Sequence, residues 1–166
     1  MDTNKLLQVA SEIIAKVPAC MAITVDSNGN ADARVVNTKA LTSDWTVRFV
    51  TDLRTRKAQE IQRSGRLTLA YQYEAGHSYV SLVGRAAITN DVAGKTASWR
   101  PESYRWHPGG PADPNVVYID FTAERIELWS TSDEVVPDDP TRGLWAAVLV
   151  REDAGWRQTT SLPPQA

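Results

Sequence analysis

The chain opens with apolar residues at helical spacing and continues with patterns typical of strands. Residues 3–17 place seven apolar side chains at helix-compatible spacing and are followed by Pro18, so they are predicted to form an amphipathic helix. Residues 54–64 contain good helix formers and stop at Gly65, which predicts a second, shorter helix. Helices are therefore expected to be few.

Most of the remaining chain consists of short β-branched and aromatic runs separated by turn residues. The clearest hairpin signal is Asn28-Gly29, because Asn-Gly readily supplies the positive φ of a tight turn. Gly84 interrupts one apolar run and is expected to mark a β-bulge. Strands are predicted at residues 20–25, 31–38, 45–51, 67–73, 79–89, 116–121 and 125–129, with a last hairpin over 144–151 and 155–161.

Three other stretches complete the predicted element order. Asp91 is a helix cap, and the residues after it are predicted to form two short helices broken by Pro101. Residues 107–114 are rich in Pro and Gly and predict an ordered loop or lid, while residues 122–124 predict a turn between two short strands. This order predicts a mainly β fold: an antiparallel sheet of six or seven strands with few helices, closed into a small barrel.

Composition narrows the class of protein. The 166 residues include 18 Lys+Arg and 20 Asp+Glu, a formal net charge of −2, so nucleic acid is not expected as a partner. No apolar run approaches the ~20 residues that a membrane helix needs. The single cysteine, Cys20, allows no internal disulfide, and the N-terminal sequence lacks the layout of a signal peptide. We therefore expect a cytoplasmic protein without a membrane partner, in which Cys20 is a packed apolar residue.

Positive charge is concentrated in one segment. Residues 48–66 contain six cations and two anions, a local charge of +4. Thr51, Thr55, Arg56 and Lys57 fall where a predicted strand ends and a helix begins, so hydroxyls, free N–H groups and cations converge there, which suits a phosphate. The alternative, a solvated helix face that carries surface cations, remains open.

Two further cations, Arg34 and Lys39, stand five positions apart on a predicted strand. Strict alternation would place their side chains on opposite faces. They are therefore expected to join one anion site only if the strand ends by Asn37.

Other constellations point to no specific chemistry. His77 and His107 are isolated and the chain has one cysteine, so no metal is expected. The sequence contains no nucleophile elbow, phosphate-binding P-loop or Rossmann glycine fingerprint, so hydrolase, nucleotide kinase and Rossmann dehydrogenase functions lack their motifs. His107 is kept as a candidate on the substrate side.

Four segments in this order resemble the flavin-binding segments of the pyridoxamine 5′-phosphate oxidase-like split-barrel superfamily. They are RVVNTK at residues 34–39, FVTDLRTRK at 49–57, LTLAYQ at 67–72 and VSLVG at 80–84. The run RWHPGGPADP at residues 105–114 is similar to the general stress protein 26 branch, and such a run is rare by chance. The likeness covers about residues 3–131.

The resemblance implies a homodimer of six-stranded antiparallel split barrels, with FMN, or alternatively FAD, in each of two clefts at the subunit interface. It implies that the ribityl phosphate is held by Arg34, Lys39, Thr55, Arg56 and Lys57. The isoalloxazine ring would be lined by Val35, Val36, Val50 and Thr51, and Asn37 is counted with these cofactor-binding residues. Tyr79 stands where the oxidase pattern has a glutamine that reaches the flavin, and Trp129 matches a tryptophan that approaches the cofactor from the partner subunit.

The resemblance also implies flavin-mediated hydride or electron transfer at N5 of the cofactor. The C-terminal Arg-x-His pair of the vitamin B6 oxidases is absent after Trp129, so pyridoxamine 5′-phosphate oxidation is not expected. We predict an FMN-dependent oxidoreductase or flavin carrier with a small-molecule substrate or a nicotinamide electron donor. Two alternatives stay open: a non-catalytic protein that stores or senses flavin, deazaflavin F420 or haem, and a dimeric scaffold in which the cations are surface charges.

The residues beyond the resemblance are predicted to form an appendage. Residues 1–131 are the predicted FMN-binding split-barrel domain, and residues 132–166 are the predicted acidic linker and C-terminal hairpin. Trp145 and Trp156 lie in that hairpin and need a surface to bury against. The hairpin is therefore expected to pack on the barrel or on the partner subunit.

Overall fold

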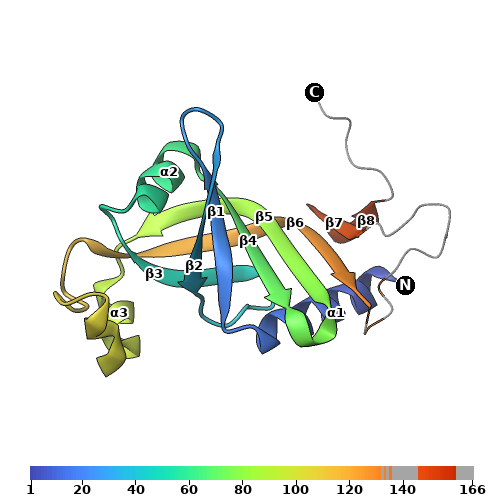
Figure 1. Cartoon of the computed structure of the whole chain (residues 1–166), viewed down its shortest axis with the longest axis horizontal. Coiled ribbons are helices and arrows are strands. Elements are labelled where there is room, and N and C mark those ends of the chain that lie inside the picture. Colours follow the sequence, from blue (N-terminus) through green and yellow to red (C-terminus); the bar gives the residue numbers. More distant parts are fainter. Residues whose placement is uncertain (132, 134, 136–145, 160–166) are drawn as a thin grey trace.

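The computed structural model describes residues 1–131, 133, 135 and 146–159 (Figure 1). No helix among these residues is long and apolar enough to span a membrane. In chain order the elements are α1 (Thr3–Lys16), β1 (Ala19–Val25), β2 (Ala31–Asn37), β3 (Thr46–Asp52), α2 (Arg56–Ser64), β4 (Arg66–Tyr73), η1 (Glu74–Gly76), β5 (Ser78–Thr89), α3 (Val92–Ser98), η2 (Pro101–Arg105), β6 (Val116–Ser130), β7 (Ala147–Glu152) and β8 (Gly155–Thr159).

The strands form one antiparallel sheet in the order β2-β1-β4-β5-β6-β7-β8, and β3 pairs with β6. The sheet curls, so that the edge strands β2 and β3 approach each other. Near one end the Lys39 N–H donates to the Arg48 carbonyl oxygen at 2.8 Å, which ties the two edges together. Strands β1–β6 therefore make a barrel that is split between β2 and β3. The mainly β, antiparallel split-barrel fold predicted from the sequence is confirmed.

The helices begin and end largely where the sequence signals placed them. Asp2 caps α1 by accepting from the Lys5 N–H at 2.9 Å, and the buried face of α1 packs against β4 and β5. Thr55 caps α2, and Gly65 ends it with the left-handed φ of 64°. Asp91 caps α3, as predicted.

The predicted turn at residues 122–124 is wrong, because β6 is one continuous strand of 15 residues. Thr122 still pairs with Thr46 of β3, and Ala123 pairs with Gly84 of β5. The pairing then resumes between Val83 and Arg125, so one extra residue of β6 bulges at Glu124. Thr122 and Glu124 are polar and interrupt the apolar pattern of the strand, which is why the sequence predicted two short strands. The bulge that the sequence placed at Gly84 is present.

Strand β7 joins the sheet by pairing with residues 125–128 of β6, and β8 follows it at the edge. Trp156 of β8 packs edge-on against Trp45, with ring centroids 5.7 Å apart. Arg151 of β7 donates to the Asp44 carbonyl oxygen at 2.9 Å. The hairpin therefore packs on the barrel, as predicted. Trp145 and the predicted boundary at residue 132 lie outside the described residues.

We predict that Gly84→Ala destabilises the fold by about 2–4 kcal/mol, because its Cβ would overpack a site without room. An ideal Cβ at residue 84 would lie 2.0 Å from the Thr122 carbonyl oxygen, which is backbone and cannot swing away. Urea unfolding followed by tryptophan fluorescence measures the loss. Ala87→Ser changes an exposed position of the same strand and is expected to shift stability by less than ~0.5 kcal/mol. Equal midpoints for the two variants would contradict the close approach.

Candidate functional site

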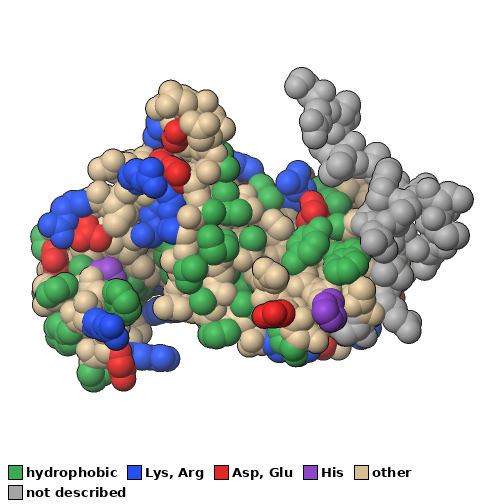
Figure 2. All heavy atoms as spheres, in the orientation of Figure 1, with side chains coloured by type: hydrophobic (Ala, Val, Ile, Leu, Met, Phe, Trp, Pro, Cys, Tyr) green, Lys and Arg blue, Asp and Glu red, His purple; other side chains and the backbone are tan. Residues whose placement is uncertain are grey.

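Charged side chains gather around the start of α2, where β3 ends and β2 begins (Figure 2). Helix α2 follows β3 after a three-residue turn, so its first turn lies beside the end of β3. The Thr51 hydroxyl is buried and lies 3.5 Å from the Thr55 hydroxyl. The N–H groups at the start of a helix have no intrahelical acceptor, so this end of α2 offers donors and a positive dipole.

Arg34 of β2 is fixed by a network below this helix. Its guanidinium donates to the Thr24 hydroxyl at 2.5 Å and to the Asp32 carbonyl oxygen at 2.8 Å. It also forms a salt bridge of 3.4 Å with Glu60, whose buried carboxylate accepts a short hydrogen bond from Thr24. The Thr24 hydroxyl, followed by the Arg34 charge, lowers the pKa of Glu60. Glu60 is therefore an ionised, buried anchor for Arg34.

Two exposed arginines at the start of α2 are paired with carboxylates. Arg54 donates from Nε and Nη2 to Asp52 at 2.9 and 2.6 Å, and this contact lowers the pKa of Asp52 to about 2. Arg56, which is 74% exposed, lies 3.4 Å from the Asp32 carboxylate. Ion pairs this exposed are worth about 0–1 kcal/mol each.

Lys57 differs from its neighbours because, among the described residues, it forms no salt bridge and no side-chain hydrogen bond. Its side chain is half-buried. Burial, and next the nearby Arg34 charge, lower the pKa of the Lys57 ammonium. A lysine held in this way gains from the arrival of an anion more than a paired or fully exposed one does.

The cluster has a smaller net charge than the sequence segment suggested. Arg34, Arg54, Arg56 and Lys57 face the carboxylates of Asp32, Asp52 and Glu60, so four cations meet three anions and the net charge is +1. The open cation is Lys57. The predicted concentration of cations at the strand-to-helix junction is therefore present, but most of it is already neutralised.

Lys39 lies away from this cluster. Its ammonium donates to the Ser98 hydroxyl at 2.8 Å and to the Tyr118 hydroxyl at 3.0 Å. Its Nζ also stands 4.7 Å from the centroid of the Tyr118 ring, which Arg48 covers as well at 4.5 Å. Strand β2 ends at Asn37, but the chain then carries Lys39 towards α3. Within the described residues no contact joins Lys39 to Arg34.

The apolar residues assigned to the ring line the split of the barrel. Val35 is 66% exposed on the free edge strand β2, whereas its neighbour Val36 is 8% exposed and belongs to the core. Asn37 is exposed at the end of β2. Val50 is half-buried on β3. Val35 and Val50 thus leave apolar surface on either side of the split.

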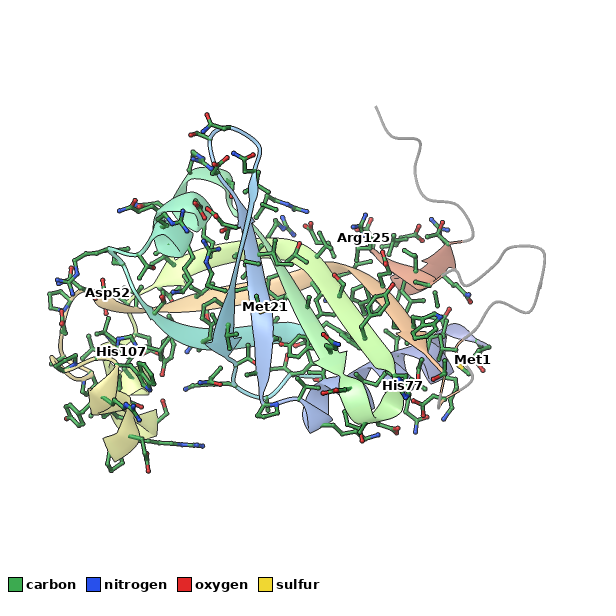
Figure 3. The ribbon with its side chains drawn as sticks, viewed as in Figure 1. Met1, Met21, Asp52, His77, His107 and Arg125 are labelled. Carbon is green, nitrogen blue, oxygen red and sulfur yellow. The ribbon has the colours of Figure 1, made fainter. Side chains whose placement is uncertain are left out.

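A lobe formed by α3, η2 and the Pro-Gly-rich loop stands beside the cluster. The buried Lys95 ties the lobe to the barrel: its ammonium donates to the Asn90 side chain at 2.9 Å and to the Val116 carbonyl oxygen. His107 packs near Trp99, with ring centroids 6.1 Å apart. Burial lowers the pKa of His107, on which the charges of Asp52, Lys57 and Asp113 also act. His107 therefore lies at the cluster end of the molecule (Figure 3).

A separate pocket of about 490 Å³ opens at the far end of β4, β5 and β6. Tyr79 and Trp129 lie opposite each other on β5 and β6 and both line it. Burial, and then the 2.9 Å hydrogen bond that Tyr79 donates to Glu127, raise the pKa of Tyr79 to about 12. The buried indole Nε1 of Trp129 has no hydrogen-bond partner in the part of the chain that the structure describes. The other lining residues are Met21, Ala70, Tyr71, Gln72, Tyr73, Glu74, His77 and Ser78.

The pocket and the cluster cannot serve one ligand within one chain. Val117, the β6 partner of Thr51, and Trp129 are twelve positions apart on β6, which corresponds to roughly 40 Å of extended strand. Figure 3 shows the same separation, with Asp52 and His107 at one end of the molecule and His77 at the other. The structure therefore brings together Arg34, Thr51, Thr55, Arg56 and Lys57, but neither Tyr79 nor Trp129.

Sequence reasoning missed the carboxylates that hold the arginines. Asp32 and Arg34 alternate at i and i+2 on β2, which places them on one face, so strand periodicity could have found Asp32. Glu60 gives no such signal, because its contact with Thr24 joins positions 36 residues apart. The pocket-lining residue Met21 falls within the predicted strand at residues 20–25 and carries no separate signal in the sequence.

The donor set at the cluster suits a phosphate monoester. It combines a half-buried ammonium that has no partner among the described residues, the Thr51 hydroxyl, and the start of a nine-residue helix. The apolar surface of Val35 and Val50 continues from this point along the split, so a flat aromatic group attached to the phosphate would meet apolar walls. The residues present thus fit a phosphorylated aromatic compound of the flavin type.

Comparison with known proteins gives a family model and several folds. The model described as pyridoxamine 5′-phosphate oxidase like matches residues 5–137. A protein from Clostridium acetobutylicum related to general stress protein 26 is 22% identical with a TM-score of 0.65, and the match covers 80% of this chain and 92% of that one. No protein of the curated set matches the sequence significantly.

Two further solved structures share the fold over nearly the whole chain. PhzG from Burkholderia lata 383, solved in complex with tetrahydrophenazine-1-carboxylic acid, is 20% identical with a TM-score of 0.66, covering 98% of this chain and 93% of that one. A pyridoxamine 5′-phosphate oxidase-related, FMN-binding protein from Nostoc punctiforme is 16% identical with a TM-score of 0.62, covering 95% and 96%.

Proposed function

The chain belongs to the pyridoxamine 5′-phosphate oxidase-like family, and we propose that it binds a flavin, FMN in the first place, through the phosphate at the start of α2. The observation that carries this proposal is Lys57, a half-buried ammonium with no described partner beside two hydroxyls and a helix start. The name of the Nostoc relative, an FMN-binding protein, supports the same cofactor.

In this proposal each residue has a separate task. Lys57 and the start of α2 take the phosphate, and Arg34, held by Glu60, and Arg56 stand next to it. Thr51 offers a hydroxyl, while the Thr55 hydroxyl donates to the Asp52 carbonyl oxygen at 2.7 Å and caps the helix. The ring lies along the split against Val35 and Val50, with Asn37 at its edge, while Val36 supports this wall from the core. Lys39 is not a phosphate ligand in this proposal, because its ammonium already donates to the hydroxyls of Ser98 and Tyr118.

A second copy of the chain completes the site in this proposal. Tyr79 and Trp129 face a pocket that lies far along β6 from the same chain's phosphate cluster. An exposed sheet face that carries Val35, Val25 and Met21 lies between the two, and Figure 2 shows apolar side chains gathered over β1, β4 and β5. Two such faces packed antiparallel would bring one chain's pocket to the other chain's cluster.

The bound flavin would supply hydride or electron transfer, which the side chains cannot. The chain's own residues would bind the flavin, orient it and shield its ring from water. The cluster fixes the phosphate end, and Val35 and Val50 exclude water from the ring. Trp129 of the second copy, which lines the pocket, would supply an aromatic surface beside the ring. We therefore propose an oxidoreductase acting through this flavin on a small molecule, in the cytoplasm.

The cofactor is tested by titrating the purified protein with FMN and riboflavin and following flavin fluorescence. We expect Lys57→Ala to weaken FMN binding by about 30-fold, the value of a charge-assisted hydrogen bond of ~2 kcal/mol. Arg56→Ala should weaken it by about threefold, because Arg56 is exposed and already paired. Lys5→Ala, an exposed lysine of α1, is the control. If Lys57→Ala binds FMN as tightly as the native chain, the phosphate does not bind at the start of α2.

The second copy is tested by sedimentation velocity on the FMN-loaded protein. We expect a dimer for the native chain. Met21→Glu puts a charge on the proposed contact face and should give a monomer with much weaker FMN binding, whereas Asn4→Glu, which adds the same charge to the exposed surface of α1, should leave both unchanged. A monomer that holds FMN stoichiometrically would contradict the shared site.

Turnover separates an enzyme from a flavin store. With NADH or NADPH under anaerobic conditions, an oxidoreductase should bleach the absorbance near ~450 nm within seconds, and the colour should return with an added electron acceptor. Free FMN at the same concentration is the control. Bleaching no faster than that of free FMN would favour storage or sensing of the flavin, and no flavin binding at all would favour the F420, haem or scaffold alternatives.

A further inference from the structure

The carboxylate of Asp32 occupies the arginines of the phosphate cluster. Its Oδ2 lies 3.4 Å from Nη1 of Arg56 and 3.9 Å from Nη2 of Arg34. Its side chain is 25% exposed, so it faces solvent at the mouth of the cluster rather than its base. An incoming phosphate would meet these same two guanidinium groups. Asp32 therefore stands where a ligand oxygen would bind.

The other two carboxylates of the cluster are committed elsewhere. Glu60 is buried, accepts from Thr24 and cannot leave Arg34 without stranding a buried charge. Asp52 accepts two hydrogen bonds from the Arg54 guanidinium and one from its backbone N–H at 2.8 Å. By contrast, the partly exposed Asp32 carboxylate lies 3.4 Å from the exposed Arg56 and 3.9 Å from Arg34, and it also interacts with the Glu60 carboxyl group. Of the three, Asp32 is the one that a ligand can displace.

We propose that Asp32 is an internal competitor for the ligand phosphate, and that it sets how strongly this chain prefers a phosphorylated flavin over the same flavin without phosphate. This inference rests on the proposed function. When the phosphate arrives, Arg56 exchanges the Asp32 carboxylate for a phosphate oxygen, and Asp32 turns to solvent. The neighbouring like charge then opposes the bound dianion. The site thereby holds its cofactor less tightly than its cations alone would.

Replacing Asp32 by asparagine isolates this effect. The change removes the charge and keeps the shape, and the Asp32 backbone carbonyl oxygen still accepts from Arg34 at 2.8 Å. Arg34 is also still held by Thr24 and Glu60. Removing one like charge within about 5 Å of a phosphate dianion corresponds to roughly tenfold in affinity. We therefore expect Asp32→Asn to bind FMN about tenfold more tightly, with riboflavin affinity unchanged.

The experiment measures FMN and riboflavin dissociation constants for the native chain, Asp32→Asn and Asp153→Asn. Asp153→Asn makes the same change of net charge in the exposed β7–β8 turn, at the other end of the molecule (Figure 1), and should alter neither constant. If Asp32→Asn does not fold, as judged by its circular dichroism, Asp32→Ala takes its place. In the Arg56→Ala background the gain from Asp32→Asn should be smaller, because no pair with Arg56 has to be broken there, and the part that remains is the repulsion between Asp32 and the phosphate.

The outcomes separate the two proposals. Equal FMN affinity for the native chain and Asp32→Asn, or a parallel gain for riboflavin, would show that Asp32 does not compete with the phosphate, although the flavin site would stand. Weaker FMN binding by Asp32→Asn would make Asp32 a positioning group and overturn the inference. If neither flavin binds any of these proteins, the proposed function itself is wrong and the role of Asp32 falls with it.

Discussion

The backbone of β6 is the constraint on which the rest of the structure depends. One edge of this strand pairs with β5 along almost its whole length. The other edge is shared: β3 pairs with residues 116–122 and β7 with residues 125–128. The extra residue at Glu124 marks the change of partner, and Arg66 and Arg85 hold its carboxylate. β3 thus pairs with half of this edge of β6. Its own second edge pairs with no other strand among the described residues and forms one lip of the split.

The electrostatics of the cluster follow from this geometry. β2 and α2 meet across the end of the split, so cations from both elements come close and would repel one another without the carboxylates between them. Glu60, buried and bonded to Thr24, is part of the fold. Among the described residues Lys57 forms no salt bridge. The folded chain thus tolerates the cluster by neutralising most of it and leaving one ammonium open.

Local patterns predicted most of the elements from the sequence, and long-range contacts account for what they missed. Pro18, Gly65 and Asp91 act within their own turns, so the ends of the helices could be predicted. The continuity of β6 could not, because the partners of Thr122 and Ala123 lie on β3 and β5.

The same division holds for the candidate site. The junction of β3 and α2 was visible as a run of hydroxyls and cations. The position of Lys39 away from the cluster was not visible, since it depends on Ser98 and Tyr118, which are distant in the chain.

The packing of Trp45 against Trp156 links an early segment of the chain to the last strand, and this affects the order of folding. β1 can pair with β4, and β3 with β6, only after the later strand has been synthesised. The half of the β6 edge that β3 does not pair with is covered only after β7 and β8 have been synthesised. Pairings between distant segments form slowly and leave strand edges open meanwhile. On the ribosome, the nascent barrel would therefore pass through a stage with an uncovered edge and an unpacked Trp45, the period in which it is most prone to aggregate and most in need of a chaperone.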